Sequence, residues 1–477
     1  MIKNLSKKSL IFLISVAFFV SLTLYYSSLD YYFFQDDFFE INISKAQNFS
    51  QYLDFFKFRD DIIAYRPISL QHYFFVSTKI FGLDPSGFRL ITFIFFFSSA
   101  VLIIQVIKKI TQNLNIGVLC ASLWLLSSIH FMSLTWIAAA YNIIGTFFWL
   151  LTSLFFLKYQ EKPKLFFYVL ALIAFLLTIG SFEFSVTWPI IFGFYYFYVL
   201  KNSLLRSLRF FSPFIAFTII YLMLRLLLIK VPQIPEYYLA FNLESIKALF
   251  WYSLFSFNIP EEFKKQVATS LLVFRWKFIS EYWPLVLKSF LGALIILTIS
   301  VFMPIYNILK RGLKASLALI LFALVWFTVG IFPVLLLPNH TFAMYLTLPA
   351  IGIYLLIAYL FVGFGVKLLV IPLLIIWLFT SATTLSFYKT NSWMVEAQRI
   401  SFEFASRAKR QFPTLPHGSV IFYPTGDTRH IQALMQDHAV KAIYNDDSLS
   451  VYYDKKTLMG DLAKGGYNKL VYVYQSQ

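Results

Sequence analysis

The chain has 477 residues, of which 59% are hydrophobic, 20% aromatic and only 13% charged. Soluble domains carry about 25% charged residues, so this composition excludes an ordinary soluble protein. Apolar runs of about 18 or more residues recur along most of the chain, as expected for helices that cross a bilayer. The sequence therefore predicts an all-α polytopic membrane protein.

The formal net charge of +17 is compatible with a nucleic-acid partner, but the positions of the charges argue against one. Much of the Lys and Arg lies in short loops between apolar runs, which is the pattern of the positive-inside rule. We therefore expect membrane lipid as a partner and no nucleic acid. The single cysteine, Cys120, lies within an apolar run and excludes an intrachain disulfide framework.

About eleven spans are predicted in chain order. The first covers residues 10–29 and has no small-residue cleavage site after it, so we expect an uncleaved helix with a cytoplasmic N-terminus. The other ten cover residues 88–107, 116–131, 134–157, 165–179, 184–200, 210–229, 283–309, 315–337, 342–364 and 368–385. Residues 1–385 thus form a predicted transmembrane domain, with a first outer loop at about 30–87.

The orientation follows from the loops. Each proposed inner loop carries Lys or Arg, whereas the short outer turns near His130, Glu183 and His340 carry none. We expect a multi-pass protein of the cell (plasma or inner) membrane. Its last part, residues 386–477, is predicted to be a small extracytoplasmic α/β domain. "NSWMVEAQRISFEFASRAKRQF" is typical of an amphipathic helix, and "GSVIFYP", "LSVYYD" and "KLVYVYQ" are typical of short strands.

Ionisable residues at a membrane edge are functional candidates, because each costs free energy unless it is paired or hydrated. In this topology the unusual ones gather on the outer side: Asp36, Asp37, Arg66, His72, His130, Glu183 and His340. The cytoplasmic side carries only dispersed basic anchors. Any chemistry is therefore expected to face the exterior.

The stretch "YYFFQDDFFEI" contains the most informative of these residues. If a short helix begins at Gln35, then Asp36, Asp37 and Glu40 share one polar face. Three carboxylates together could bind a divalent cation such as Mg²⁺ or Mn²⁺. They could instead leave one carboxylate with a raised pKa, suited to accept a proton. A helix cap with a solvated edge is the alternative, and the residues alone leave these open.

Two further residues support a site on the same side. Arg66, in "AYRPISLQHYFF", is of the type that binds phosphate or carboxylate bidentately, although an interfacial Arg also extends toward headgroups. Glu183, in "TIGSFEFSVTWP", is a second carboxylate at the same membrane level, or a helix cap. Single histidines such as His130 and His340 are more often structural. The sequence contains no P-loop, no G-x-G-x-x-G and no Cys/His metal spacing.

The ordered motifs resemble the GT-C superfamily of membrane glycosyltransferases, and within it the protein O-mannosyltransferase-like branch. The matching segments are "FQDDFFEI", "YRPISLQHYFFVSTKIFGLDPSGFRLITFIFF", "WIAAAYNIIGTFFWLLTSLFFLKY", "GSFEFSVTWPIIF", "YLMLRLLLI" and "LLLPNHTFAMYLTLPAIGIY". They cover most of the predicted membrane region. The resemblance implies a donor sugar carried on a polyprenyl phosphate and transfer on the outer face.

The resemblance also implies roles for residues. Asp36 or Asp37 would be the general base. The resemblance favours Asp36 as the base and Asp37 as its partner, although adjacent carboxylates titrate as a pair. Arg66 would hold the donor phosphate or order the loop. Glu183 stands where the family has a glutamate at the outer end of a span.

The chain departs from the family pattern at several positions. Ala140 and Asn142 follow the tryptophan where the family often has W-I-[SG]-x-R-x-D, and Phe182 replaces the lysine of a K-E pair. The usual E-R-Y is Ala343-Met344-Tyr345, which keeps only the tyrosine. Arg66, Arg225 or His340 would have to supply the missing positive charge, and Tyr345 remains a candidate substrate-binding residue. The family branch's TPR tail is replaced by the small outer domain.

The leading hypothesis is an inverting glycosyltransferase that moves a hexose or pentose from a polyprenyl-phosphate donor to a hydroxyl or amine of a glycan, lipid or protein. The alternatives are a lipid-linked-sugar transporter and a catalytically weakened GT-C scaffold. A transporter would place charged groups near the bilayer midplane rather than at one edge. The absence of the Arg and Glu residues that the family has at the positions of Ala140, Ala343 and Met344 favours the catalytically weakened scaffold.

Overall fold

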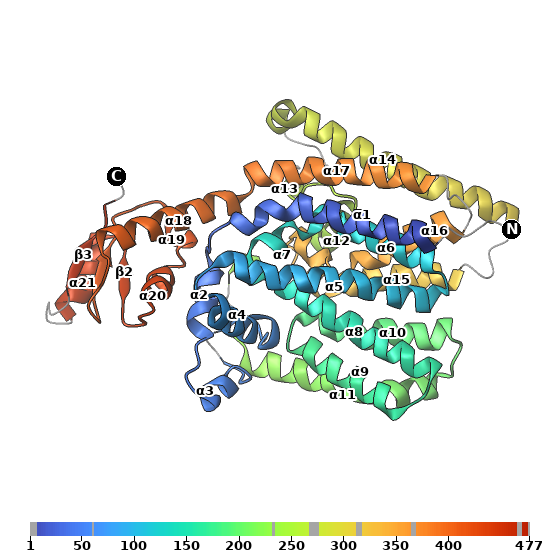
Figure 1. The fold of residues 1–477 in the computed structure, drawn as a ribbon, viewed down its shortest axis with the longest axis horizontal. Coiled ribbons are helices and arrows are strands. Elements are labelled where there is room, and N and C mark those ends of the chain that lie inside the picture. The colour runs from blue at the N-terminus through green and yellow to red at the C-terminus, as the bar shows by residue number, and fades with distance from the viewer. Residues whose placement is uncertain are drawn as a thin grey trace.

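The computed structural model describes residues 7–59, 62–230, 234–266, 276–311, 317–363, 369–464 and 470–475. A bundle of long helices occupies one part of the molecule, and a small α/β domain extends from one end of it (Figure 1). The helices of the bundle are α1 (Lys7–Tyr25), α5 (Pro85–Thr111), α6 (Leu114–Leu125), α8 (Tyr141–Glu161), α9 (Leu165–Ile179), α10 (Trp188–Phe194), α11 (Leu204–Leu228), α12 (Leu243–Phe255), α14 (Trp276–Arg311), α15 (Leu317–Leu335), α16 (Ala350–Gly363) and α17 (Val370–Asn391).

Within the described residues, seven helices are long and apolar enough to cross a membrane, or eight if the bent pair of α6 with Ser128–Thr135 is one span. The three remaining predicted spans fall on short or interrupted helices. They are α9, α16, and α10 with the π-helical turn η6 (Tyr195–Val199). A 15-residue helix such as α9 is only about 22 Å long, less than the roughly 30 Å of a hydrocarbon core. The chain is therefore a multi-pass membrane protein, but eleven full spans are not present among these residues.

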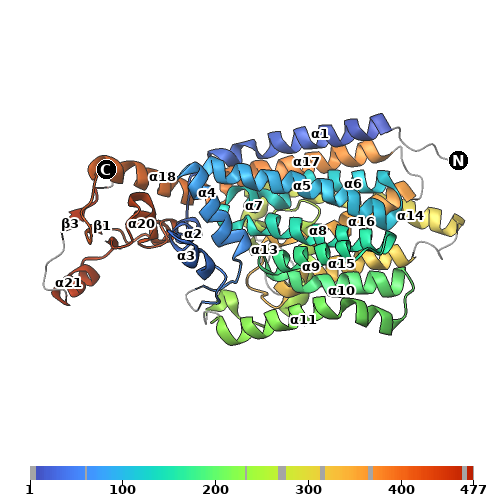
Figure 2. The same ribbon diagram turned by 60° about the horizontal axis from the view of Figure 1, so that its bottom comes forward.

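Short irregular elements gather at the end of the bundle that carries the α/β domain (Figures 1 and 2). The predicted first outer loop contains α2 (Asp36–Ile43), α3 (Phe49–Asp54), the π-helical turn η2 (Ile68–His72) and α4 (Tyr73–Phe81). The other short elements are η1 (Tyr26–Asp30), η3 (Ser128–His130), α7 (Phe131–Thr135), η4 (Ile137–Ala139), η5 (Glu183–Thr187), η7 (Pro235–Tyr237), α13 (Glu262–Gln266) and η8 (Ala343–Leu346).

The bundle core is built around large aromatic side chains. Trp124, Trp149, Trp188, Trp326 and Trp377 are all less than 2% exposed. Two of them donate hydrogen bonds to the ends of neighbouring helices: Trp124 Nε1 to the Thr347 carbonyl (2.7 Å) and Trp377 Nε1 to the Leu123 carbonyl (3.0 Å). Such bonds satisfy the indole N–H groups in an apolar interior and fix the helices to one another.

The C-terminal domain begins directly after the last membrane helix. Its first helix, α18 (Trp393–Gln411), starts at Ser392, whose hydroxyl accepts the Met394 N–H. A three-stranded parallel sheet follows, in the order β2-β1-β3, with β1 (Val420–Phe422), β2 (Ser450–Tyr452) and β3 (Val471–Val473). In register, Val420 faces Ser450 on one side and Val471 on the other. The remaining helices are α19 (Thr428–Ala433), α20 (His438–Tyr444) and α21 (Lys455–Lys464).

The predicted amphipathic helix and the three predicted strands are thus confirmed. The division of the chain into domains at residue 385 stays a prediction; α17 itself continues to Asn391.

The close approach of α15 and α16 at Gly352 generates a stability prediction. A Cβ at Gly352 would lie 2.5 Å from the Ala323 carbonyl oxygen and 2.7 Å from the Phe327 nitrogen, both backbone atoms that cannot rotate away. Gly352→Ala should therefore lower the free energy of unfolding by about 1–3 kcal/mol, measured by thermal unfolding in detergent. Gly193→Ala is the matched control, because its Cβ meets nothing within 4 Å, and equal effects of the two variants would contradict this account.

Candidate functional site

Asp37 is held tightly by backbone groups. Its side chain is fully buried, with Oδ1 accepting the Ala138 N–H at 2.7 Å and Oδ2 accepting the Phe34 N–H at 3.2 Å. Burial raises its pKa to about 7, against the lowering effects of Arg89 and these two amides. Asp37 therefore joins the start of α2 to η4, the segment that precedes α8.

A buried arginine completes this anchor. Arg89, near the start of α5, is 1% exposed and donates to the carbonyls of Tyr31, Tyr32 and Thr135. Its guanidinium thus ties the chain just before α2 to the end of α7, and its charge acts on Asp37. Arg89 is a positioning residue that sequence reasoning missed, although an arginine within the first turns of an apolar helix is the kind of signal that marks a site.

Asp36 has a different environment from its neighbour. Its side chain is partly exposed, and no described residue donates a hydrogen bond to it. Burial raises its pKa to about 6, opposed by the positive charge of Arg66. Glu40, one turn further along α2, is buried and accepts a hydrogen bond from Gln71 Nε2 at 3.3 Å. Burial and the charge of Asp36 raise the pKa of Glu40 to about 8. Asp36 is the most exposed carboxylate of α2.

Arg66 and Glu183 form an ion pair that joins the segment between α1 and α5 to η5. Arg66 Nε and Nη2 lie 3.1 and 2.9 Å from Glu183 Oε2, and Arg225 Nη1 lies 3.5 Å from Oε1. Burial alone would raise the pKa of Glu183, but the two guanidinium groups outweigh it and lower that pKa. Two guanidinium groups around one carboxylate leave one net positive charge, and all three side chains are 16–25% exposed.

The local backbone explains why Arg66 reaches Glu183. The π-helical turn η2 follows Pro67 and lies along the end of α9, where the Ile68 N–H donates to the Gly180 carbonyl at 2.9 Å. The Ser69 hydroxyl donates to the Ser181 carbonyl at 2.5 Å. These bonds align the two segments, so that Arg66 meets Glu183 where both chains leave their helical turns.

Aromatic side chains surround this ion pair. The Arg66 guanidinium lies 3.4 Å from the centre of the Tyr141 ring. Tyr345 lies 5.9 Å, ring to ring, from His340, which also contacts Tyr237 at 5.1 Å. Burial and the charge of Arg66 lower the pKa of His340 to about 4. His340 is therefore neutral near pH 7 and does not supply the positive charge expected of it, whereas Arg225 does stand beside Arg66.

The predicted metal site on Asp36, Asp37 and Glu40 does not form. Among the described residues, no group of three or more His, Cys, Asp or Glu side chains could hold one metal ion. The reason is local: both oxygens of Asp37 accept backbone N–H groups, and Glu40 is turned to Gln71. The three carboxylates therefore share a helix but not a ligand geometry.

The other two candidate histidines, His72 and His130, lie apart from this cluster. His72 shares a hydrogen bond of 2.9 Å with the Tyr52 hydroxyl of α3. His130 is fully buried, with its Nε2 2.8 Å from the Trp124 carbonyl oxygen and its ring between aromatic neighbours. Both are explained by packing.

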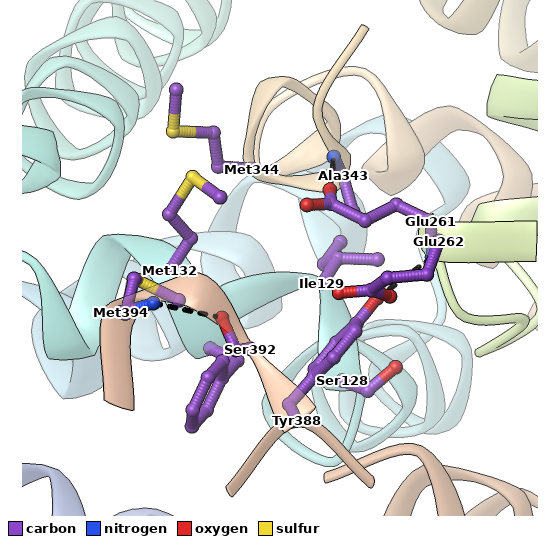
Figure 3. A pocket seen from close by; sticks show the side chains of 11 residues that line it. Ser128, Ile129, Met132, Glu261, Glu262, Ala343, Met344, Tyr388, Ser392 and Met394 are labelled. Atoms are coloured by element: carbon purple, nitrogen blue, oxygen red, sulfur yellow. Dashed lines mark hydrogen bonds between the residues drawn. The ribbon is translucent and has the colours of Figure 1, made fainter. Parts of the chain in front are cut away.

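A second acidic pair, Glu261 and Glu262, lies next to η8. Glu261 accepts the Ala343 N–H at 2.5 Å, and Glu261 and Glu262 line a small cavity with Tyr388 (Figure 3). The cavity, about 10 Å³, has room for about one water molecule. It is too small for a sugar or a phosphate. Glu261 instead fixes η8, the turn that carries Tyr345 at the candidate site.

These features define a class: a polytopic membrane protein whose polar site lies where broken helices, the segment between α1 and α5 and a C-terminal domain meet. No protein-family model matches the chain, and no curated protein does.

Solved structures are similar in fold. The oligosaccharyltransferase of Archaeoglobus fulgidus in the apo form matches with a TM-score of 0.50 and 13% identity, over 94% of this chain and 65% of that chain. The ArnT protein of Cupriavidus metallidurans bound to undecaprenyl phosphate matches with a TM-score of 0.48 and 12% identity, over 98% of this chain and 90% of that one. The chain thus spans about two thirds of the oligosaccharyltransferase. At this identity the likeness to it shows the fold alone: the expected GT-C fold is confirmed, and the O-mannosyltransferase branch stays a prediction.

The different environments of Asp36 and Asp37 predict different changes in the free energy of unfolding when each is replaced by asparagine. Asp37→Asn places an NH₂ group where an oxygen accepts a backbone N–H, and should lower the free energy of unfolding by about 1–3 kcal/mol. Asp36→Asn removes no hydrogen bond to a described residue and should change it by less than about 0.5 kcal/mol. Thermal unfolding of both variants in the same detergent tests this. A larger loss in Asp36→Asn than in Asp37→Asn would show that the assignment is wrong.

Proposed function

We propose that this protein is a membrane glycosyltransferase that moves a sugar from a polyprenyl-phosphate donor to an acceptor hydroxyl or amine on the outer face of the membrane. The observation that carries the proposal is a partly exposed carboxylate, Asp36, within the electrostatic influence of Arg66, which belongs to a net-positive cluster with Glu183 and Arg225. A base and a phosphate-binding group are the two parts that such a transfer needs. The GT-C fold is compatible with it.

Asp36 is the proposed general base. It takes the proton of the acceptor O–H or N–H while the acceptor atom forms a bond to the anomeric carbon of the sugar. The bond between that carbon and the phosphate oxygen breaks, and its electron pair leaves with the polyprenyl phosphate. Attack from the side opposite the phosphate inverts the anomeric centre. Asp37 acts through position: its bonds to Phe34 and Ala138 fix the helix on which Asp36 stands.

Arg66 and Arg225 are the proposed partners of the leaving phosphate. Glu183 holds both guanidinium groups, with one face of Arg66 on the Tyr141 ring, so their direction is set before the donor arrives. The arginines would take the place of the basic residues that the family has at the positions of Ala140, Phe182 and Met344. Tyr345 and His340 border the same space and would contact the sugar or the phosphate as neutral groups. The residues do not fit a carboxylate-held cation, so no step is assigned to one.

A transporter for lipid-linked sugars is less well supported. The helix of Asp36, α2, lies at the end of the bundle next to the C-terminal domain (Figure 1), and Glu183 and Arg225 stand at or just beyond the ends of α9 and α11 rather than halfway along them. The weakened-scaffold alternative rests on the missing family residues, but Asp36, Arg66, Glu183 and Arg225 form an intact set of base and cationic groups.

Replacement of the base tests the proposed function. Asp36→Asn should lower transfer from a panel of undecaprenyl-phosphate hexoses and pentoses by at least about 100-fold, because general bases contribute about 10²–10⁴ in rate. Transfer is measured as labelled sugar incorporated into membrane acceptors. Binding of undecaprenyl phosphate to the same variant should be retained, which serves as the control for folding. Transfer within threefold of the unmodified protein would refute the mechanism.

The raised pKa of Asp36 gives a pH prediction. A base works only when deprotonated, so kcat/KM should fall about tenfold per pH unit below pH 6, where Asp36 takes up a proton. Above that pH the acid limb should be flat. An ordinary carboxylate would place this limb near pH 4. Undecaprenyl phosphate binding over the same range separates an effect on the donor from one on the base, and a rate that rises below pH 6 would contradict the assignment.

A further inference from the structure

The C-terminal domain contacts α2, the helix of the proposed base. Asn42 Nδ2 donates to the His438 carbonyl at 2.8 Å, and Lys45 Nζ lies 2.6 Å from Asp447 Oδ1. At the other end of the helix, the Gln35 N–H donates to the Ala433 carbonyl at 2.8 Å. The C-terminal domain therefore bonds to residues on both sides of Asp36 in the sequence.

Gln35 has an unusual backbone conformation. Its φ is 51° and its ψ is −127°, a region that glycine adopts readily and other residues rarely do. A glutamine persists there only where its surroundings over-determine the conformation. Asp36 follows directly, so the backbone at Gln35 sets the direction in which α2 starts and its first carboxylate points.

The group that holds Gln35 is itself fixed by the C-terminal domain. The Ala433 carbonyl lies at the end of α19 and also accepts the Ser401 hydroxyl of α18 at 2.9 Å. Upstream, the Tyr32 N–H meets Gln398 Oε1 of α18 at 3.4 Å. Two helices of the domain thus converge on the turn before Asp36, whereas the bundle holds the helix through Asp37 and Glu40.

We propose that Gln35 is a positioning residue held in a strained conformation by the C-terminal domain, and that this domain thereby aims Asp36 at the acceptor. The role as an aiming device rests on the proposed function; the mechanical coupling of the domain to α2 does not. The domain is then part of the catalytic machinery through Gln35 rather than an appendage.

The coupling is tested by amide hydrogen exchange of peptides within residues 31–45, on the full chain in detergent. Asn42→Ala should lower the protection of α2 about fivefold, because it removes the bond of Nδ2 to the His438 carbonyl and its longer contact with His438 Nδ1 at 3.3 Å. Asn202→Ala is the matched control, because it also removes an amide-to-carbonyl bond (Asn202 Nδ2 to the Tyr196 carbonyl, 3.1 Å) but far from α2. If Asn42→Ala does not fold, Lys45→Ala breaks the second contact.

Strain at Gln35 is tested by its replacement with glycine. If the conformation is strained, Gln35→Gly should raise the protection of α2 at least threefold, and should restore protection in the Asn42→Ala background. If it is not strained, glycine should lower protection, because it has more conformational freedom to lose on folding. A fall in protection, or no effect of Asn42→Ala beyond that of Asn202→Ala, overturns the proposal.

Kinetics separate this inference from the proposed function. Asn42→Ala should lower kcat at least fivefold while binding of undecaprenyl phosphate changes less than twofold, and added Gln35→Gly should recover most of kcat. A matching loss of binding would show a general structural role and refute the aiming role. If no variant or parent transfers sugar, the proposed function fails, while the exchange measurements still decide the coupling.

Discussion

The constraint on which the site depends is the need to satisfy backbone groups where helices stop inside a membrane protein. The bilayer core offers no water to a free N–H or C=O group. At one end of this bundle, side chains take over: Asn258 Oδ1 accepts the Ser128 N–H at 2.8 Å, Asp37 accepts the Ala138 N–H, and Glu261 accepts the Ala343 N–H. The polar residues that make a site thus have a prior structural cause, because broken helices require them.

That constraint divides the two adjacent aspartates. Asp37 faces inward, and both its oxygens are used by amides from two segments of the chain. A proton taken up there would disturb bonds that hold α2 in place. Asp36, on the neighbouring helical position, is free of such bonds to the described residues. Adjacent positions on a helix point about 100° apart, so one residue can serve as the anchor and the next as the reactive group.

Much of this arrangement was predictable from the sequence. Charge placement predicted that Asp36, Arg66 and Glu183 lie on the same side of the membrane part, and in the structure Arg66 bonds Glu183 and its charge acts on Asp36. Short segments bounded by Gly, Pro and Asp predicted the three C-terminal strands. The helix breaks were not predictable, because hydropathy averages over a break: residues 184–200 are apolar throughout yet form a 3₁₀ turn, a short helix and a π turn. The sequence also did not predict the role of Arg89 or the burial of Asp37, for a related reason. Hydrogen bonds between segments distant in the chain leave no local pattern.

The electrostatics of the finished site favour an anionic substrate. At neutral pH, three ionised carboxylates on α2 would repel a phosphate, but burial raises the pKa values from about 6 at Asp36 to about 7 at Asp37 and about 8 at Glu40. Asp36, the most exposed of the three, has the lowest of these pKa values and is mostly ionised near pH 7. Burial of Glu40 thus lowers the negative charge of α2 near pH 7, while Asp36, the proposed base, keeps its charge. Beside it, Glu183 remains ionised because two guanidinium groups compensate its burial. Burial therefore leaves Glu40 largely protonated near pH 7, whereas Glu183, paired with Arg66 and Arg225, stays ionised within a cluster of net positive charge.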